Sequence, residues 1–206
     1  MPTILLATHN KGKIQRYRAL FGAFKDLELV TLNDLNITTK VDEPFATARE
    51  NSIHKAKSYA EISGLPTIAI DEAVTTNFLP AGEQPGVFVR RFGGGKELSD
   101  AEVLAVWRKV FASYPDHKHE FVWDFSLSYC NPITKDLRAT QAEQIDLVAL
   151  NFSEEINPGY PMSSFLVPTG LDKTYIELDA TERALVDQKN LKPFLDFMSD
   201  LLIGEK

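Results

Sequence analysis

The sequence predicts a mixed α/β fold with an elongated central sheet and flanking helices. Two observations support this class. In the first third of the chain, short apolar runs alternate with stretches of helical spacing, which is typical of strands that interleave with helices. In the second half, two long apolar stretches are separated only by a turn at Asn131-Pro132, which indicates an antiparallel hairpin. The 206 residues suffice for one sizeable core, as one domain or a domain with two lobes.

The first half of the chain opens with an apolar run over Thr3–Ala7, suited to a buried strand. From Lys11 the apolar residues recur at helical spacing as far as Phe24, and Glu28–Leu32 then reads as a second strand. A long helix over Phe45–Ile62 is expected to end at Gly64 and Pro66. A third strand is expected over Thr67–Ile70, where it runs directly into Asp71-Glu72, and Val74–Leu79 is expected to continue as a strand.

In the second half, Ser99 is a suitable N-cap for a helix that presents Val103, Trp107 and Phe111 on one face. Apolar residues that alternate with mostly polar neighbours predict a half-buried strand over Phe121–Tyr129. The remaining expected elements are strands over Leu137–Leu150 and Phe165–Val167 and closing helices over Asp179–Asp187 and Leu191–Leu202.

Charge and composition exclude several classes of function. The net charge of −7 disfavours binding to a nucleic-acid polymer, which needs a basic surface. Cys130 is the only cysteine, so neither an intrachain disulfide nor a cysteine metal cluster is expected. The apolar stretch Ile4-Leu5-Leu6-Ala7 is too short for a signal peptide or a membrane span. We therefore expect a cytoplasmic protein that does not bind membranes.

The polar loop Thr8-His9-Asn10-Lys11-Gly12-Lys13 joins the first strand to the first helix. Such a junction presents unpaired backbone N–H groups, and the helix dipole adds partial positive charge. Thr8 and Asn10 offer further hydrogen bonds, and Lys13 lies in the first turn. The loop thus predicts a phosphate cradle, although a plain turn followed by a solvated lysine is the alternative.

Carboxylates on a helix and at the end of a strand form a second candidate site. Glu50-Asn51 lies on the long helix, and Asp71-Glu72 follows the third strand. Mg²⁺ prefers oxygen ligands and shares them with substrate phosphates, and one carboxylate could deprotonate an attacking water. The alternative is solvated surface charge, which is common for acidic residues at the ends of elements.

Taken together, these segments resemble the inosine triphosphate pyrophosphatase family, whose members hydrolyse non-canonical purine nucleoside triphosphates. The first loop resembles the family's (T/S)xNxxK start, and the segment Phe45–Ala56 resembles its ENxxxKA helix. The resemblance extends, in the same order, through Leu65–Asp71, Gln84-Pro85-Gly86-Val87, Arg91-Phe92-Gly93, Asp172-Lys173-Thr174 and Glu177-Leu178.

The resemblance implies a fold of two lobes with the active cleft between them, usually in a homodimer. It also implies Mg²⁺-dependent hydrolysis of a nucleoside triphosphate to the monophosphate and pyrophosphate. Carried over by position, Glu50 and Asp71 would hold the metal, and Asp71 and Lys13 would serve catalysis, with Asp71 activating water. The expected substrate-binding residues are Thr8, Asn10, Lys13, Lys55, Arg91, Lys173, Asp187, Gln188 and Lys189.

The sequence departs from the family at its paired acids. The family's Asp-Asp-Ser-Gly is here Ile70-Asp71-Glu72-Ala73, so the first acid is lost and a new one follows Asp71. Because neighbouring side chains of a strand point to opposite faces, we expect that Glu72 does not simply replace the acid missing at position 70. Metal binding should then be weaker, with Glu50 and Asp71 remaining.

A second departure affects the base. The family reads its purine with Ser-His-Arg, which aligns with Asp187-Gln188-Lys189, and its sheltering FGYDP segment is altered to Tyr160-Pro161-Met162-Ser163-Ser164-Phe165. A carboxylate repels a carbonyl oxygen, and lysine lacks the planar fork of arginine. We therefore expect a base preference altered from ITP and XTP, and Asp187 with Gln188 would suit a base bearing an exocyclic amine.

Two other motifs were weighed. Gly93-Gly94-Gly95-Lys96 does not match a P-loop, because Arg90 stands where a glycine is required and Glu97 follows the lysine. A zinc site at Asp116, His117, His119 and Glu120 is less favoured than solvated histidines. Arg90-Arg91 could bind phosphate or pair with surface acids.

The leading functional hypothesis is therefore a Mg²⁺-dependent nucleoside triphosphate pyrophosphatase with altered base preference. The alternative is a catalytically impaired relative that binds a nucleotide or a protein partner through the inherited cleft. Hydrolysis of a non-nucleotide phosphate ester is a third possibility.

Overall fold

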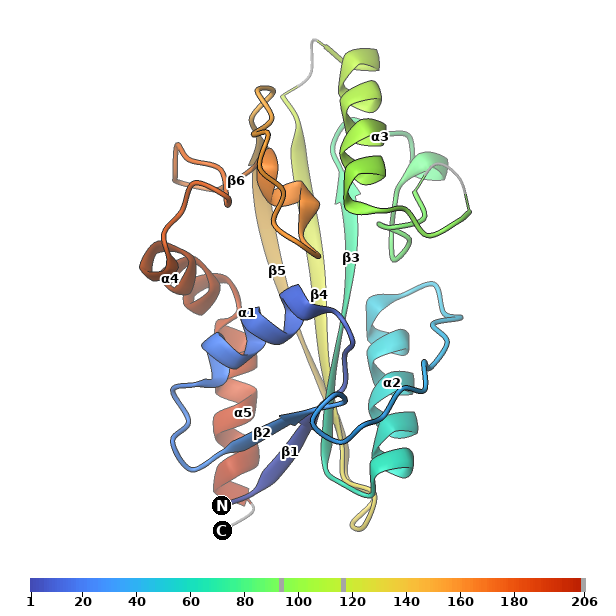
Figure 1. Ribbon diagram of the computed structural model, residues 1–206, viewed down its shortest axis with the longest axis vertical. Coiled ribbons are helices and arrows are strands. Elements are labelled where there is room, and N and C mark those ends of the chain that lie inside the picture. Colours follow the sequence, from blue (N-terminus) through green and yellow to red (C-terminus); the bar gives the residue numbers. More distant parts are fainter. Residues whose placement is uncertain (93–94, 116–117, 205–206) are drawn as a thin grey trace.

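The computed structural model describes residues 1–92, 95–115 and 118–204, which build one mixed sheet with helices against both faces (Figure 1). The sheet has six strands in the order β2-β1-β3-β4-β5-β6. Pairing of β1 with β2 and β3 is parallel, whereas β3–β4, β4–β5 and β5–β6 are antiparallel. The expected mixed α/β sheet is confirmed. The strands are β1 (Thr3–Leu6), β2 (Glu28–Thr31), β3 (Thr67–Thr76), β4 (Glu120–Cys130), β5 (Leu137–Val148) and β6 (Leu166–Pro168).

The helices lie close to their expected places. They are α1 (Lys11–Phe21), α2 (Ala48–Ser63), α3 (Asp100–Ser113), α4 (Ala180–Asn190) and α5 (Lys192–Gly204), with short 3₁₀ turns η1 (Ala81–Glu83) and η2 (Pro161–Ser164). The second helix begins three residues later than expected, because Thr47 caps it and its hydroxyl accepts a hydrogen bond from the Glu50 backbone N–H. None of these described helices is long and apolar enough to cross a membrane.

Strand β3 runs without a break through Asp71-Glu72 and ends at Thr76, three residues before the expected end at Leu79. It pairs with β4 along its whole length, from Thr67 opposite Cys130 to Thr76 opposite Phe121. The pairing with β4 satisfies the backbone hydrogen-bonding groups of Asp71 and Glu72, so the strand tolerates these acidic side chains. As a result, two carboxylates project from the middle of the sheet.

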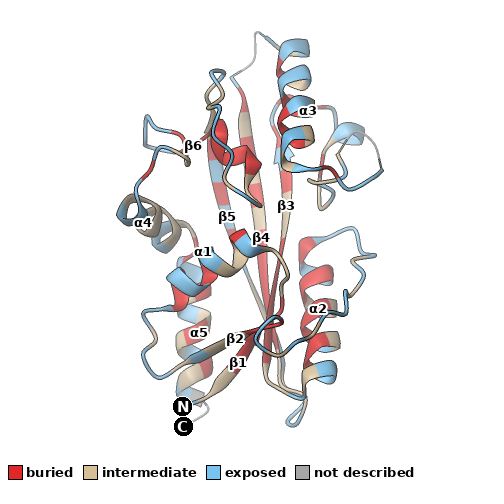
Figure 2. Cartoon of the chain, in the orientation of Figure 1, coloured by how far each residue is buried: buried red, intermediate tan, exposed pale blue. Residues whose placement is uncertain are grey.

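Two apolar clusters lie on opposite sides of β3, and buried residues line both (Figure 2). The larger cluster joins Ile68, Ile70 and Val74 to side chains of α1, α3 and α5. The smaller cluster joins Ala69 to Ala56 and Tyr59 of α2 and to Leu5 of β1. Since side chains alternate along a strand, odd-numbered residues of β3 face α2 and even-numbered residues face α1.

Candidate active site

The loop after β1 folds as a capped helix start. The Asn10 side-chain oxygen accepts hydrogen bonds from the backbone N–H groups of Gly12 (2.9 Å) and Lys13 (3.2 Å), and the Thr8 hydroxyl accepts one from Asn10 N–H (3.1 Å). The sequence predicted unpaired N–H groups here, but the Asn10 cap satisfies two of them. The donors that this loop offers an anion are therefore chiefly side chains, above all the Lys13 ammonium.

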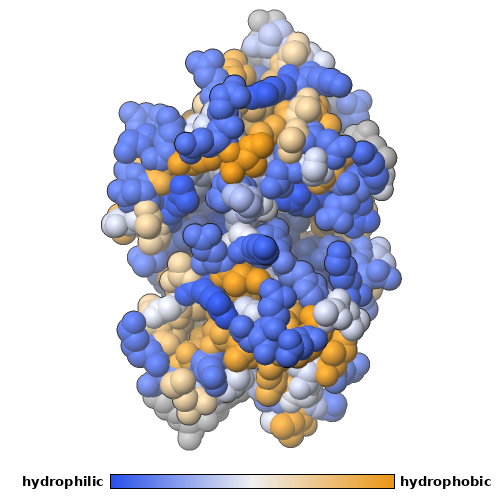
Figure 3. Space-filling model, viewed as in Figure 1, coloured by the Kyte–Doolittle hydropathy of each residue, from blue (hydrophilic) through white to orange (hydrophobic). Residues whose placement is uncertain are grey.

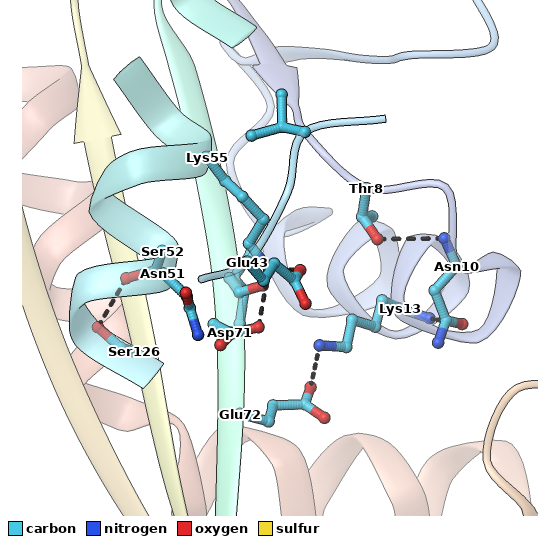
Figure 4. A network of polar contacts seen from close by, with 12 residues as sticks. Thr8, Asn10, Lys13, Glu43, Asn51, Ser52, Lys55, Asp71, Glu72 and Ser126 are labelled. Atoms are coloured by element: carbon cyan, nitrogen blue, oxygen red, sulfur yellow. Dashed lines mark hydrogen bonds and ion pairs between the residues drawn. The ribbon is translucent and has the colours of Figure 1, made fainter. Parts of the chain in front are cut away.

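A buried lysine joins two carboxylates on the α2 side of β3. The Lys55 ammonium lies 2.8 Å from Asp71 Oδ1 and 2.8 Å from Glu43 Oε1, and it donates to the Ile70 carbonyl at 3.0 Å (Figure 4). The side chains of Lys55 and Asp71 are only 9% and 8% exposed. Glu43 lies in the segment before α2, and sequence reasoning missed it because no periodic pattern marks that segment.

Two neighbouring polar residues of α2 hold this arrangement in place. The Asn51 side chain bonds both the N–H (3.0 Å) and the carbonyl (3.1 Å) of Phe45, which folds the segment before α2 against the helix. The Ser52 hydroxyl contacts the hydroxyls of Ser126 (3.0 Å) and Ser128 (2.8 Å) on β4. Together these bonds fix α2 on the sheet and bring Glu43 to Lys55.

The surroundings shift the ionisation of this cluster. Burial raises the pKa of Asp71, although the Lys55 ammonium opposes that shift. Burial by itself would lower the pKa of Lys55, but Asp71 and Glu43 outweigh it and the lysine stays charged. A carboxylate with a raised pKa, held beside a cation, is suited to accept a proton from water.

Glu72 occupies the opposite face of β3. Its Oε1 lies 3.4 Å from Lys13 Nζ and accepts a hydrogen bond from the Tyr17 hydroxyl at 3.4 Å, so it faces α1. Ile70 packs in the same cluster as Tyr17. The expectation that Glu72 does not replace the acid missing at position 70 was wrong in its geometry, because residues two apart in a strand share a face. Glu72 therefore supplies a carboxylate on the face of β3 that packs toward α1, two residues after Ile70.

In the middle of α1, Arg16 binds Asp187 of α4 through Nε (3.0 Å) and Nη2 (2.7 Å). Tyr160 closes the same region, since a Cβ added to Gly12 would lie 2.5 Å from the Tyr160 ring. In the space-filling view a largely hydrophilic hollow crosses the middle of this face, where α1 lies in Figure 1 (Figure 3). Lys13 in the first turn of α1 thus faces Glu72, and Arg16 one turn further along faces Asp187, while Tyr160 packs against the start of the helix at Gly12.

A family model described as the Ham1 family matches residues 4–190 of this sequence. The chain belongs to the Ham1 family. This confirms the resemblance to inosine triphosphate pyrophosphatases. The dITP/XTP pyrophosphatase of Dictyoglomus thermophilum is 28% identical over 204 residues, which cover 94% of each chain. The dITP/XTP pyrophosphatase of Staphylococcus aureus is 27% identical over 206 residues, or 100% of this chain and 99% of its own.

Solved structures share the fold. The Ham1 protein of Staphylococcus aureus superposes with a TM-score of 0.73 at 21% identity and covers 99% of this chain and 100% of its own. The HAM1 protein of Coxiella burnetii gives a TM-score of 0.76 at 21% identity over the same shares. The Ham1 fold is therefore kept throughout the chain, even where site residues differ.

Several residues expected at the Ham1 site make other contacts. Glu50 is exposed in the first turn of α2, where its carboxylate accepts a hydrogen bond from the Thr47 hydroxyl at 2.6 Å. Lys173 is exposed and pairs with Glu182 at 2.8 Å. Arg91 is exposed with its guanidinium 5.2 Å from the centre of the Phe88 ring, and Gln188 and Lys189 are exposed on α4. Their roles toward a substrate stay predictions.

The remaining sequence hypotheses have partial answers. Arg90 pairs with Asp100 at 2.6 Å. Two residues of the hypothetical zinc site, Asp116 and His117, lie outside the described residues. Gly93 and Gly94, from the motif that does not match a P-loop, lie outside them as well. His119 is buried against the Phe78 and Phe111 rings, and its Nε2 lies 2.8 Å from the Tyr114 carbonyl oxygen. Within the described ranges, no three His, Cys, Asp or Glu side chains converge as a preformed metal cluster.

Proposed function

We propose that this Ham1 family member is a Mg²⁺-dependent pyrophosphatase that hydrolyses a nucleoside triphosphate to the monophosphate and pyrophosphate. The observation that carries the proposal is the buried Lys55–Asp71 pair at 2.8 Å beside the Lys13–Glu72 pair at 3.4 Å. Two cations and several carboxylates in one polar network (Figure 4) provide what phosphoryl chemistry needs: positive charge for the phosphates and a base for water. The curated relatives with the name dITP/XTP pyrophosphatase support the same reaction class.

The protein's own residues divide the chemistry between them. Asp71 accepts a proton as water oxygen forms a bond to phosphorus and the bond to the pyrophosphate leaving group breaks. Lys55 holds the Asp71 carboxylate in place through the 2.8 Å contact. Lys13, with Asn10 and Thr8, binds phosphate oxygens at the start of α1, where the ammonium offsets the charge that moves onto the leaving group.

The carboxylates of this site fit a divalent cation. The Lys55 ammonium lies 2.8 Å from both Asp71 Oδ1 and Glu43 Oε1, which brings the two carboxylates together and leaves their second oxygens, Oδ2 and Oε2, for a divalent cation. Mg²⁺ is commonly held by one or two carboxylates together with substrate phosphates, so a preformed cluster is not required. Asp71 and Glu43 would hold it, with Glu72 nearby and Glu50 kept as a prediction from sequence. The metal would neutralise phosphate charge.

The base end supports a preference that differs from that of the dITP/XTP-named relatives. Gln188 and Lys189, which align with the family's base-reading residues, are exposed. The Asp187 carboxylate binds Arg16 through Oδ1 alone, so its Oδ2 can still accept a hydrogen bond from an exocyclic amine. The amine-bearing base therefore stays a prediction, and the altered residues favour a changed preference.

Two further expectations belong to this proposal. The single domain of two lobes over residues 1–206 and the homodimer follow from the family resemblance. Light scattering on the purified chain measures the assembly directly, and about twice the 23.1 kDa chain mass is the expected result.

A nucleotide panel tests the proposal. Pyrophosphate release is measured for ITP, XTP, GTP, UTP, ATP and CTP, with Mg²⁺ titrated from zero and chelator as the blank. Turnover of at least one triphosphate that requires the metal is expected. A chain that binds a triphosphate yet hydrolyses none of them would instead support the catalytically impaired binder.

A further inference from the structure

Asp100, the first residue of α3, binds two segments that are far apart in the sequence. Its Oδ1 accepts a hydrogen bond from Arg90 Nη2 at 2.6 Å, and its Oδ2 accepts one from the Gly159 backbone N–H at 3.0 Å. Arg90 is fixed in turn, because its Nη1 donates to the Leu98 carbonyl at 3.2 Å and its own carbonyl accepts from Leu98 N–H at 2.7 Å. Both oxygens of the Asp100 carboxylate are therefore engaged, one by each segment.

Gly159 lies directly against the loop at the start of α1. Its φ of +85° is in the left-handed region that favours glycine, and a Cβ added there would lie 2.7 Å from Asn10 Oδ1. The same Asn10 oxygen accepts the hydrogen bonds from the backbone N–H groups of Gly12 and Lys13. The turn at Gly159 thus packs on the cap that fixes the first turn of α1, where Lys13 lies.

Tyr160 extends this contact along α1. A Cβ added to Gly12 would lie 2.5 Å from the Tyr160 ring, so the ring packs on the Gly12 backbone. The Tyr160 hydroxyl is buried, and burial raises its pKa, while the Arg16 guanidinium one turn further along α1 opposes that rise. Figure 1 shows this turn, in orange, between the start of α3 and the start of α1. The turn is therefore held from α3 on one side and packs on α1 on the other.

The Arg90 end of this path also lies near the proposed site. Arg91 follows Arg90 in the chain. Burial opposes the ionisation of Glu43, yet Lys55 and, more weakly, Lys13 and Arg91 lower its pKa. Arg91 is therefore close enough to act on the carboxylates around Lys55. One carboxylate, that of Asp100, holds both the segment that carries Arg91 and the turn that packs on the cap of α1.

We propose that Asp100 is a positioning residue, which holds the Gly159–Tyr160 turn and through it keeps Asn10 and Lys13 in the geometry that receives phosphate oxygens. The inference rests on the proposed function and adds to it a residue outside the site. Asp100 acts through Gly159, since both of its oxygens are already engaged. A displacement of about 1 Å in a group that contacts substrate costs up to about 100-fold in rate, so the effect of Asp100 is on turnover.

Substitutions at Asp100 and Arg90 test this assignment with the best triphosphate of the panel. Asp100→Ala removes both acceptors and should lower kcat/KM by about 10- to 100-fold, mainly through kcat, because Lys13 offsets charge that develops on the leaving group. Asp100→Asn keeps an acceptor for Gly159 N–H and should recover most of that loss. Arg90→Gln leaves the Gly159 bond in place and should cost about threefold or less.

Glu102→Gln is the matched control for a weakened start of α3. Glu102 lies in the same first turn, pairs with Lys96 at 2.7 Å and completes the capping box with Ser99. Its substitution weakens the helix start but leaves the bond between Asp100 and Gly159 intact. Glu102→Gln should therefore keep kcat/KM within about twofold of the wild type, with urea titrations showing that each variant is folded.

A double-mutant cycle with Lys13 separates positioning from a general loss of structure. Lys13→Met removes the ammonium that Asp100 is proposed to position. In that background, Asp100→Ala should cost less than about threefold more, because the group it acts on is already missing. A residue that only stabilises the fold would show the same fold-loss in both backgrounds.

The outcomes separate the inference from the function beneath it. A wild type that hydrolyses no triphosphate overturns the proposed function, and the dissociation constant for ATP with Mg²⁺, measured by calorimetry, then decides the inference. That constant should rise by about 5- to 10-fold in Asp100→Ala and stay unchanged in Glu102→Gln. A wild type that neither hydrolyses a triphosphate nor binds ATP overturns both.

The inference alone fails on three results. They are a folded Asp100→Ala with wild-type kcat/KM, an equal loss in Glu102→Gln, and fully additive losses in the cycle with Lys13→Met. If Asp100→Ala does not fold, Gly159→Ala replaces it, since the added Cβ meets Asn10 Oδ1 from the other side of the same contact. It must then show the same loss of kcat and the same non-additivity with Lys13→Met.

Discussion

Asp71 and Glu72 are neighbours in β3, yet their carboxylates bind lysines from different helices. Asp71 Oδ1 lies 2.8 Å from Lys55 Nζ of α2, and Glu72 Oε1 lies 3.4 Å from Lys13 Nζ of α1. The alternation of side chains along a strand produces this division. These two adjacent residues of β3 therefore connect α2 and α1, both of which contribute residues to the proposed triphosphate site.

The Glu72 carboxylate is expected to support metal binding. Glu72→Gln keeps the side-chain size and removes the charge, so the Mg²⁺ concentration for half-maximal turnover should rise by about tenfold. Glu61→Gln, an exposed position on α2, is the control and should leave it unchanged. Identical Mg²⁺ dependence in Glu72→Gln and the wild type would show that Glu72 has no such role.

Lys55 should be important for stability as well as for the site. Lys55→Met leaves Asp71 buried without its cation, which should lower the free energy of unfolding by about 3–5 kcal/mol in urea titrations. Lys192→Met removes an exposed ion pair, in which the side chains of Lys192 and Asp196 are 69% and 62% exposed. This substitution should change the free energy of unfolding by less than about 1 kcal/mol. Equal effects of the two substitutions would contradict the assignment of Lys55 to a buried pair.

The buried Asp146 predicts a pH dependence of stability. Burial raises its pKa to about 6 in the folded state, above the ordinary aspartate value. The folded state then binds a proton that the unfolded state has released, so the contribution of Asp146 to stability falls as pH rises from about 4 to about 6. The loss from this group is roughly 2–3 kcal/mol.

Unfolding titrations at pH 4.5 and 7 measure this contribution, with Asp146→Asn as the comparison. The substituted chain should lose less stability than the wild type between the two pH values. The same pH-dependent loss in both chains would place the titrating group elsewhere.

Gly12 is expected to tolerate no side chain. An added Cβ would lie 2.5 Å from the Tyr160 ring, so Gly12→Ala must displace Tyr160 and should destabilise the fold by about 1–3 kcal/mol. Gly82→Ala meets open space and should stay within about 0.5 kcal/mol of the wild type. Thermal unfolding of the three chains measures the difference, and a neutral Gly12→Ala would contradict the close packing of Tyr160.

Hydrophobic periodicity predicted most of the fold, because it reports which face of an element is buried. It placed α1, α3 and β4 well, where apolar residues such as Tyr17, Trp107 and Phe125 repeat regularly and lie in the core. It did not show how far β3 extends, because backbone pairing with β4 carries the strand through Asp71-Glu72 as far as Thr76. The local pattern of apolar and polar residues does not indicate which distant strand a segment pairs with.

The site was predicted only in part for a similar reason. Lys13 and Asp71 lie on regular elements, and Thr8 and Asn10 lie in the short loop between β1 and α1, so motif and spacing were enough to propose them. Glu43 reaches Lys55 because Asn51 folds the preceding segment back, and Arg16 meets Asp187 across 171 residues of sequence. Neither contact has a periodic signature, and only the folded chain reveals them.

Product analysis of one reaction tests the central claim most directly. The wild type and Asp71→Asn are each incubated with Mg²⁺ and the best triphosphate of the panel, and the products are separated by anion exchange. We expect the wild type to form monophosphate and pyrophosphate in equal amounts, and Asp71→Asn to form them about 10²- to 10⁴-fold more slowly. Release of diphosphate and inorganic phosphate, or equal rates for the two chains, would contradict a pyrophosphatase that uses Asp71 as its base.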